Sequence, residues 1–133
     1  MATRRLRVLV VDDNRDIVLT TIALLRVQGH EAMDCYSGLE VIKSVKAFDP
    51  DVVVMDIGLP GRSGLDAAKD IRASVPGKRP LLIGISGEFT KGEDSVFAQM
   101  SGFDYYLIKP VDPNVLLAVL AQWADDPALK RGD

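Results

Sequence analysis

Five polar side chains stand directly after short apolar runs in this sequence, and their chemical types suit the transfer of a phosphoryl group. They are Asp12, Asp13, Asp56, Ser86 and Lys109. Three carboxylates that converge in one shallow pocket repel one another, so either some of them stay protonated or a cation neutralises them. Magnesium prefers oxygen ligands and commonly binds through one or two carboxylates plus phosphate oxygens. We therefore expect Mg²⁺ as the cofactor of this cluster.

The residue types predict different roles within the cluster. Asp56 can present one oxygen to the metal and another to an incoming phosphoryl group, as an aspartyl nucleophile does. Lys109 would offset charge on the phosphoryl oxygens, and the hydroxyl of Ser86 can donate a hydrogen bond to one of them. The set is typical of a phosphoryl acceptor.

Taken singly, these residues have ordinary structural explanations. An Asp pair after a strand is more often a turn or a helix cap, and Asp56 before a Gly-Pro loop can simply end a strand. Their joint placement favours a functional cluster, because perturbable charges gathered in one cleft usually mark a site. Elsewhere, His30 follows a glycine in a turn and is predicted to be an exposed bystander. Cys35 is predicted to be a small core residue.

The elements that must position these side chains are short β-branched runs alternating with amphipathic stretches. We predict strands at 6–11, 31–35, 52–55, 81–85 and 104–108, and helices around 16–28, 39–45, 65–74, 94–100 and 115–123. The second helix has Ser37 available as its N-cap. Each strand with its crossover helix forms one unit, and five such units predict a doubly wound α/β sheet. In the strand order 2-1-3-4-5, the strands that end in the five polar side chains are contiguous, so these side chains meet along one edge.

The composition limits the class of protein. The chain has 133 residues, 47% of them hydrophobic and 26% charged, which predicts one packed domain over 1–133. Residues 125–133 are expected to form a polar tail. The net charge of −3 offers no basic field for nucleic acid or an anionic membrane. No apolar run approaches the roughly 20 residues of a membrane-crossing helix, and one cysteine excludes an internal disulfide. We expect a cytoplasmic protein without direct nucleic-acid binding or membrane insertion.

Four stretches match one known family in residue type, order and spacing. They are Val8–Asn14, Met55–Gly61, Gly84–Gly87 and Tyr106–Pro110. Over about residues 5–124 the chain resembles the receiver (response-regulator) domain of two-component signalling. The resemblance implies a flavodoxin-like fold with five parallel strands and five helices. It also implies transfer of a phosphoryl group from a kinase phosphohistidine to an aspartate.

The resemblance implies a role for each matched position. Asp56 would be the phosphoacceptor, and Ser86 and Lys109 would contact the phosphoryl group. The implied magnesium ligands are Asp13 directly, Asp12 through water, Asp56, and the backbone carbonyl of Gly58.

A switch is implied as well. Ser86 would move toward the phosphate and Tyr106 would turn inward, which reshapes the surface of the fourth helix, fifth strand and fifth helix. From the residues alone, Tyr106 fits an ordinary half-buried strand aromatic equally well, and Tyr105 points to the other face. The family also implies a cis Lys109–Pro110 peptide. The phosphoryl lifetime stays open.

We therefore expect a stand-alone receiver, monomeric or dimeric on phosphorylation, that is not an enzyme beyond Mg²⁺-assisted self-phosphorylation and dephosphorylation. Its expected partners are a histidine kinase or histidine phosphotransfer protein and a downstream effector protein. One alternative is a receiver fragment of a hybrid histidine kinase. Another is a haloacid-dehalogenase-like phosphatase, which usually needs a second Asp where this chain has Gly58. A flavodoxin-type flavin module would need a glycine-rich phosphate cradle in place of Asp12 and Asp13. A constitutive docking domain with an unused acidic pocket is the last alternative.

Overall fold

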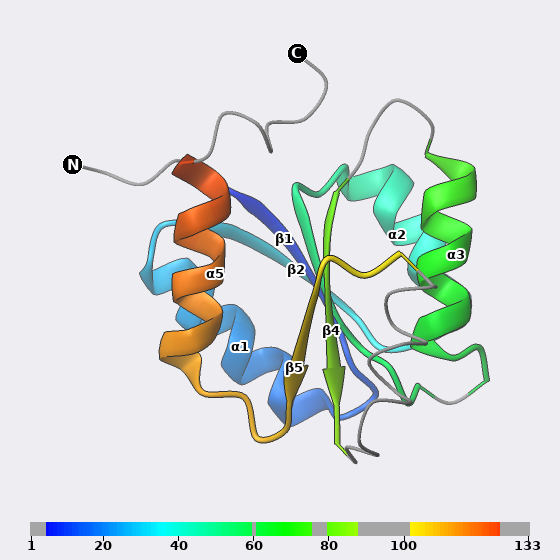
Figure 1. Ribbon diagram of the computed structural model, residues 1–133, viewed down its shortest axis with the longest axis horizontal. Coiled ribbons are helices and arrows are strands. Elements are labelled where there is room, and N and C mark those ends of the chain that lie inside the picture. The colour runs from blue at the N-terminus through cyan, green and yellow to red at the C-terminus, as the bar shows by residue number, and fades with distance from the viewer. Residues whose placement is uncertain (1–4, 60, 76–79, 88–101, 126–133) are drawn as a thin grey trace.

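One parallel sheet organises the chain. The computed structural model describes residues 5–59, 61–75, 80–87 and 102–125. Its strands are β1 (Arg7–Val11), β2 (Glu31–Cys35), β3 (Val52–Asp56), β4 (Leu81–Ser86) and β5 (Tyr105–Ile108). They pair in parallel in the order β2-β1-β3-β4-β5, which confirms the predicted topology. All strands point the same way, so their carboxyl ends share the lower edge of the sheet in Figure 1.

Helices cover both faces of the sheet. They are α1 (Arg15–Val27), α2 (Val41–Phe48), α3 (Gly64–Ser74) and α5 (Pro113–Asp125), with a short 3-10 helix at Gly38–Glu40. Helices α1 and α5 lie on one face, and α2 and α3 lie on the other (Figure 1). The predicted helix at 94–100 lies outside the described residues, as does the predicted tail beyond Asp125, where α5 ends. Within the described ranges, no helix is long and apolar enough to cross a membrane.

The sheet separates two hydrophobic clusters. In β1, Val8 and Val10 pack with α1 and α5, whereas Leu9 and Val11 pack with α2 and α3. Every residue of β3 and β4 is buried. Burial on both faces explains why these strands are continuous apolar runs rather than alternating ones. Cys35 is buried in the second of these clusters, as predicted, and Trp123 is buried in the first.

All four described helices start one or two residues away from the predicted position, and the caps of the first two explain the shifts. The side chain of Asn14 caps α1 by accepting the N–H of Ile17 at 3.2 Å, so the helix begins one residue earlier than expected. Ser37 caps the 3-10 helix by accepting the N–H of Leu39 at 3.1 Å, and α2 begins only at Val41. Leu39 is consequently 72% exposed, rather than part of the apolar face of a helix at 39–45.

The prediction that His30 is an exposed bystander was wrong. Only 7% of the residue is exposed, and its Nδ1 accepts the N–H of Leu6 at 3.0 Å. Gly29 adopts a φ of +91°, which favours glycine, and the His30 N–H donates to the carbonyl of Leu25 at 3.0 Å. This turn brings the imidazole against the residue that precedes β1.

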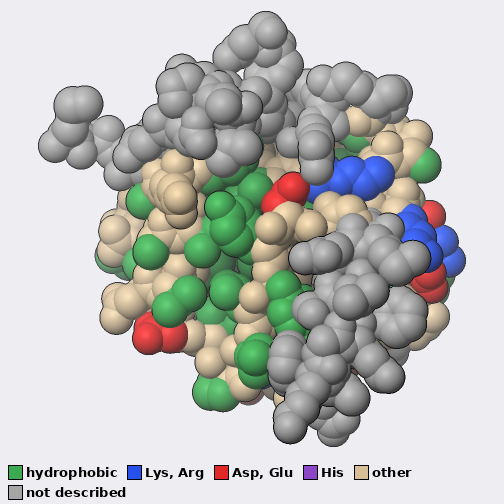
Figure 2. Space-filling view, viewed as in Figure 1, with side chains coloured by type: hydrophobic (Ala, Val, Ile, Leu, Met, Phe, Trp, Pro, Cys, Tyr) green, Lys and Arg blue, Asp and Glu red, His purple; other side chains and the backbone are tan. Residues whose placement is uncertain are grey.

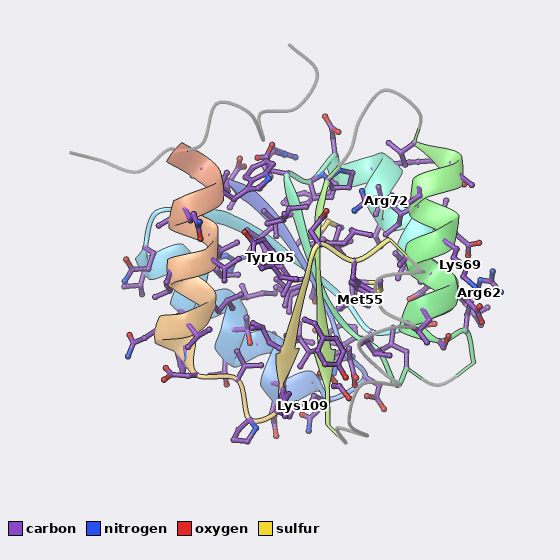
Figure 3. All side chains as sticks on the ribbon, viewed as in Figure 1. Met55, Arg62, Lys69, Arg72, Tyr105 and Lys109 are labelled. Atoms are coloured by element: carbon purple, nitrogen blue, oxygen red, sulfur yellow. The ribbon has the colours of Figure 1, made fainter. Side chains whose placement is uncertain are left out.

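Arg72 of α3 ties this helix to the starts of β4 and β5. Its Nη2 and Nε donate to the carbonyl of Gly102 at 2.6 and 3.1 Å, and its Nη1 donates to the carbonyl of Pro80 at 2.9 Å. Its Nη2 also lies 2.9 Å from Oδ2 of Asp104, which accepts the N–H of Leu82. Figure 3 shows Arg72 on the inner side of α3. One guanidinium thus links α3 to the segments before β4 and β5, the second of which lies 30 residues away in the sequence.

Candidate functional site

Three carboxylates meet at the carboxyl edge of the sheet. Asp12 follows β1, and Asp56 ends the neighbouring β3, whose Met55 pairs with Val11 of β1. One oxygen from each of Asp12, Asp13 and Asp56 lies within 4.8 Å of the others. Asp12 and Asp56 are only 4% and 7% exposed, whereas Asp13 faces solvent. The predicted convergence of the three acidic residues is therefore present.

Lys109 brings a positive charge to this cluster. Its Nζ lies 3.1 Å from Oδ2 of Asp56 and 3.3 Å from Oδ2 of Asp12. The backbone N–H of Lys109 donates to the carbonyl of Ser86 at 2.7 Å. This hydrogen bond fixes the position of the Lys109 backbone, from which the side chain extends. Figure 3 shows Lys109 at the lower edge of the sheet, where β5 ends. An ammonium between two buried carboxylates reduces their mutual repulsion.

The pKa values of two of these groups follow from their surroundings. Burial raises the pKa of the Asp12 carboxyl; the N–H of Asn14 opposes this and the charge of Asp56 adds to it, so the pKa lies above its ordinary value. Burial lowers the pKa of the Lys109 ammonium, but its hydrogen bond to Asp56 and the charges of Asp56 and Asp12 outweigh burial and raise it. The cluster therefore holds a fixed ammonium beside an excess of negative charge.

Backbone N–H groups orient the two buried carboxylates. Oδ1 of Asp56 accepts the N–H of Gly58 at 3.0 Å, and Oδ1 of Asp12 accepts the N–H of Asn14 at 2.9 Å. The other oxygen of each carboxylate faces Lys109. These hydrogen bonds restrict the rotation of both carboxyl groups. The contact of the Asn14 N–H with Asp12 was not predicted from the sequence. An Asn two residues after an Asp, at the start of a helix, was the available signal.

Gly64 allows α3 to begin directly beneath the loop after β3. A β-carbon on this residue would lie 2.4 Å from the carbonyl oxygen of Asp56 and 2.7 Å from the Cα of Ile57. The N–H of Gly64 donates to the carbonyl of Ile57 at 2.8 Å, and the side chain of Ser63 caps the helix. Only glycine fits this close approach of helix to loop.

The remaining predicted residues lie around the same edge. Ser86 ends β4, between the strands that carry Asp56 and Lys109, and is 7% exposed. Tyr106 is half-buried against the cluster on the α2 and α3 side, and Tyr105 packs on the opposite side, as the predicted alternation requires. Gly58 is exposed in the loop after Asp56. The Lys109–Pro110 peptide is cis.

The donor set fits a hard divalent cation. The three close groups are all carboxylates, and Mg²⁺ prefers oxygen ligands. Two of them are buried with a single ammonium between them, so the site can accept further positive charge. Asp12, Asp13 and Asp56 are therefore the residues that can hold such an ion.

Comparison with known proteins settles the family. The family model described as the response regulator receiver domain matches residues 8–121. The chain belongs to the receiver-domain family. This membership favours the predicted receiver over the phosphatase alternative, which the family match does not support.

Several relatives of this receiver domain are known. It is 37% identical over 118 residues to the CAI-1 autoinducer sensor kinase/phosphatase CqsS of Vibrio cholerae, covering 88% of this chain and 17% of that protein. It is 32% identical to the DNA-binding response regulator MtrA of Mycobacterium tuberculosis over 89% of this chain and 50% of that protein. It is 30% identical to Protein PilH of Pseudomonas aeruginosa over 86% and 93%. The chain thus spans half or less of the first two relatives, and a stand-alone regulator stays a prediction.

Solved structures share the fold of this receiver domain. A CheY-like receiver domain from Methanospirillum hungatei superposes with a TM-score of 0.83 at 28% identity, covering 92% of this chain and 95% of that chain. CheY4 of Vibrio cholerae superposes with a TM-score of 0.81 at 24% identity over 90% and 98%. The flavodoxin-like architecture predicted from the sequence is therefore confirmed.

Proposed function

We propose that this receiver domain accepts a phosphoryl group on Asp56 from a histidine kinase or histidine phosphotransfer protein, in a Mg²⁺-dependent reaction. One observation carries the proposal: the Nζ of Lys109 lies 3.1 Å from Asp56 and 3.3 Å from Asp12, beside a third carboxylate. Such a site combines a nucleophilic carboxylate with fixed positive charge for phosphoryl oxygens.

The side chains divide the work of this transfer. A carboxylate oxygen of Asp56 forms a bond to phosphorus while the P–N bond of the phosphohistidine breaks, and the imidazole nitrogen keeps the electron pair. The ammonium of Lys109 stabilises charge on the phosphoryl oxygens. The N–H of Gly58 holds the Asp56 carboxylate in its orientation. Ser86, on the neighbouring strand end, is placed to donate its hydroxyl to a phosphoryl oxygen.

Asp12, Asp13, Asp56 and the backbone carbonyl of Gly58 would hold the metal ion. Bound Mg²⁺ offsets the charge of the carboxylates and of the phosphoryl oxygens. The high pKa of Lys109 keeps its ammonium charged at the same time, because both neighbouring carboxylates favour the protonated form. In this proposal, the Lys109 ammonium and a metal ion together offset the negative charge of one phosphoryl group.

The proposed output is a changed surface around β5 and α5. Ser86 and Tyr106 lie on adjacent paired strands, and Gly84 of β4 pairs with Tyr106 of β5. Hydrophobic side chains gather on the face that carries these elements (Figure 2), and Ile108 and Val115 are 47% and 44% exposed there. Phosphorylation can shift Ser86 and Tyr106 only by as much as the phosphoryl group favours one arrangement over the other. An effector protein that contacts this surface would read that shift.

Further parts of the proposal concern the protein as a whole. We take residues 1–133 as a single receiver domain that acts in the cytoplasm, as a monomer or as a dimer formed on phosphorylation. Its own chemistry is limited to self-phosphorylation and dephosphorylation, so no external substrate is turned over. The net charge of −3 gives no support to direct nucleic-acid binding.

Intact-mass measurement tests the phosphoacceptor. The native chain incubated with Mg²⁺ and acetyl phosphate should gain the mass of one phosphoryl group, and EDTA should prevent the gain. Asp56→Asn should abolish it, whereas Asp70→Asn, on the outer face of α3 beside Arg62, should not. The proposal fails if the native chain stays unlabelled under conditions that label a known receiver, or if Asp56→Asn is labelled like the native chain.

A further inference from the structure

A second polar cavity lies at the opposite end of the sheet from Asp56. It has a volume of about 480 Å³ and is lined by Arg5, Arg26, His30, Glu31 and Phe48, among others. These residues surround the amino ends of β1 and β2 and the turn between α1 and β2, at the upper left of the sheet in Figure 1. None of them contributes to the acidic cluster, so this cavity has a separate chemistry.

His30 presents an N–H donor to this cavity. Its Nδ1 accepts the N–H of Leu6, so that nitrogen carries no proton. A neutral imidazole then holds its single proton on Nε2. Among the described residues, Nε2 has no hydrogen-bond partner, and it is not one of the buried unsatisfied polar atoms, so it is accessible from the cavity. An accessible N–H without a protein partner can donate to an acceptor oxygen of a bound group.

Two guanidinium groups accompany this donor. Nη2 of Arg26 donates to the carbonyl of Ala32 at 3.2 Å, which holds the side chain over the start of β2 with its other N–H groups still available. Arg5, which is exposed, lines the same cavity. An arginine carries five N–H donors in a planar fork that matches the oxygens of phosphate.

The single acidic side chain named in the lining does not cancel this charge. Glu31 lies 3.1 Å from Nη1 of Arg7, whose Nε and Nη2 donate to the carbonyl of Phe48. The carboxylate of Glu31 is therefore paired with a third arginine outside the lining. The cavity keeps an excess of positive charge from Arg5 and Arg26.

We propose that this cavity binds a phosphate group through the Nε2–H of His30 and the guanidinium groups of Arg5 and Arg26. Three separate donor groups suit a tetrahedral oxyanion, which offers more acceptor oxygens than a carboxylate. The bound group would accept the hydrogen bond of the His30 Nε2–H. The site accepts inorganic phosphate or the phosphate end of a small monoester. It does not rest on phosphoryl transfer at Asp56, which lies at the other end of the strands.

The test is an NMR titration of the ¹⁵N-labelled full chain with inorganic phosphate, in EDTA-containing buffer at constant pH and ionic strength. Saturable shifts are expected at the amides of Leu6, Gly29, His30 and Ala32, together with a shift of the His30 Nε2 signal. A parallel titration with glycerol phosphate separates the two sources: tighter binding than inorganic phosphate indicates a monoester, and equal or weaker binding indicates the free ion.

Charge-matched variants identify the binding groups. The double variant Arg5→Gln and Arg26→Gln should weaken the dissociation constant about ten-fold or more, whereas Lys43→Gln with Lys69→Gln, on α2 and α3, should leave it unchanged. His30→Asn keeps an oxygen acceptor for Leu6 but loses the Nε2–H donor, so it should weaken binding while the thermal midpoint shows that the chain still folds. The proposal is overturned by shifts that do not saturate, or by equal affinity in the native chain and the double arginine variant.

Discussion

The Nζ atom of Lys109 lies 3.1 Å from Oδ2 of Asp56, although 53 residues separate them in the sequence. Asp56 ends the central strand β3, whereas Lys109 follows β5 at the edge of the sheet. The contact therefore requires β5 to be docked on β4. In this way the charge balance of the acidic cluster depends on the packing of the outermost strand.

Replacing Lys109 should slow phosphorylation while leaving the acceptor in place. For Lys109→Gln we expect Asp56 to be labelled by acetyl phosphate about 10²-fold more slowly, because loss of one preorganised donor to transition-state charge typically costs about that much. The measurement is the rate of phosphoryl gain by intact mass, with Lys43→Gln as the control. An unchanged rate in Lys109→Gln would remove the ammonium from the mechanism.

Magnesium should stabilise the native chain through Asp13. A ligand at about a hundred times its dissociation constant adds about 2.7 kcal/mol to the free energy of unfolding. We expect such a gain from MgCl₂, measured by urea unfolding against NaCl of equal ionic strength. Asp13→Asn should lose most of the gain, and because Asp13 is exposed its stability without the metal should change by less than about 0.5 kcal/mol. An equal gain in the variant would place the ion elsewhere.

Two glycines near Asp56 should tolerate a methyl group to very different degrees. Gly64→Ala would place a β-carbon 2.4 Å from the Asp56 carbonyl oxygen, so we expect a loss of about 1 to 3 kcal/mol in the free energy of unfolding. In Gly58→Ala the nearest atom is Asp56 Oδ1 at 3.8 Å, an ordinary contact, and a change within about 0.5 kcal/mol is expected. Urea unfolding of both variants compares them, and equal losses would contradict the close approach of α3.

Acid should destabilise the fold through His30. Burial lowers the pKa of this imidazole, and its Nδ1 must stay unprotonated to accept from Leu6. The unfolded chain binds the proton more readily, so the stability from neutral His30 is present above the unfolded pKa of about 6.5 and is lost as the pH falls below it. His30→Asn retains an acceptor but cannot titrate. Urea midpoints measured across this range should therefore fall more steeply in the native chain than in the variant; parallel curves would refute the assignment.

Arg72 should contribute far more to stability than Arg62. Arg72 donates to two backbone carbonyls and to Asp104, and its removal leaves these acceptors without their cation. We expect Arg72→Ala to cost about 2 to 3 kcal/mol. Arg62 pairs with Asp70 at the surface, its side chain is 42% exposed, and Arg62→Ala should cost less than about 1 kcal/mol. Chemical unfolding of the two variants measures the difference, which must favour Arg72 for this interpretation to hold.

Most of the fold and the convergence of the cluster could be predicted because both depend on local patterns. Continuous apolar runs located the doubly buried strands, and the rule that polar strand ends share one edge brought Asp56 and Lys109 together. Features set by distant contacts could not be predicted. His30 accepts a hydrogen bond from Leu6, 24 residues earlier, and Arg72 donates to the carbonyl of Gly102, 30 residues later. Neither contact leaves a periodic trace in the sequence.

Lys109 follows the last strand of the sheet, so it is synthesised after all three carboxylates of the cluster. A nascent chain that has emerged only as far as β4 already carries Asp12, Asp13 and Asp56, but the ammonium that counters them is still inside the ribosome. Like charges without a counter-charge oppose their own assembly. The acidic cluster is thus expected to assemble late in biosynthesis, after the final strand leaves the ribosome. Until then, dissolved cations would neutralise the three carboxylates in place of Lys109.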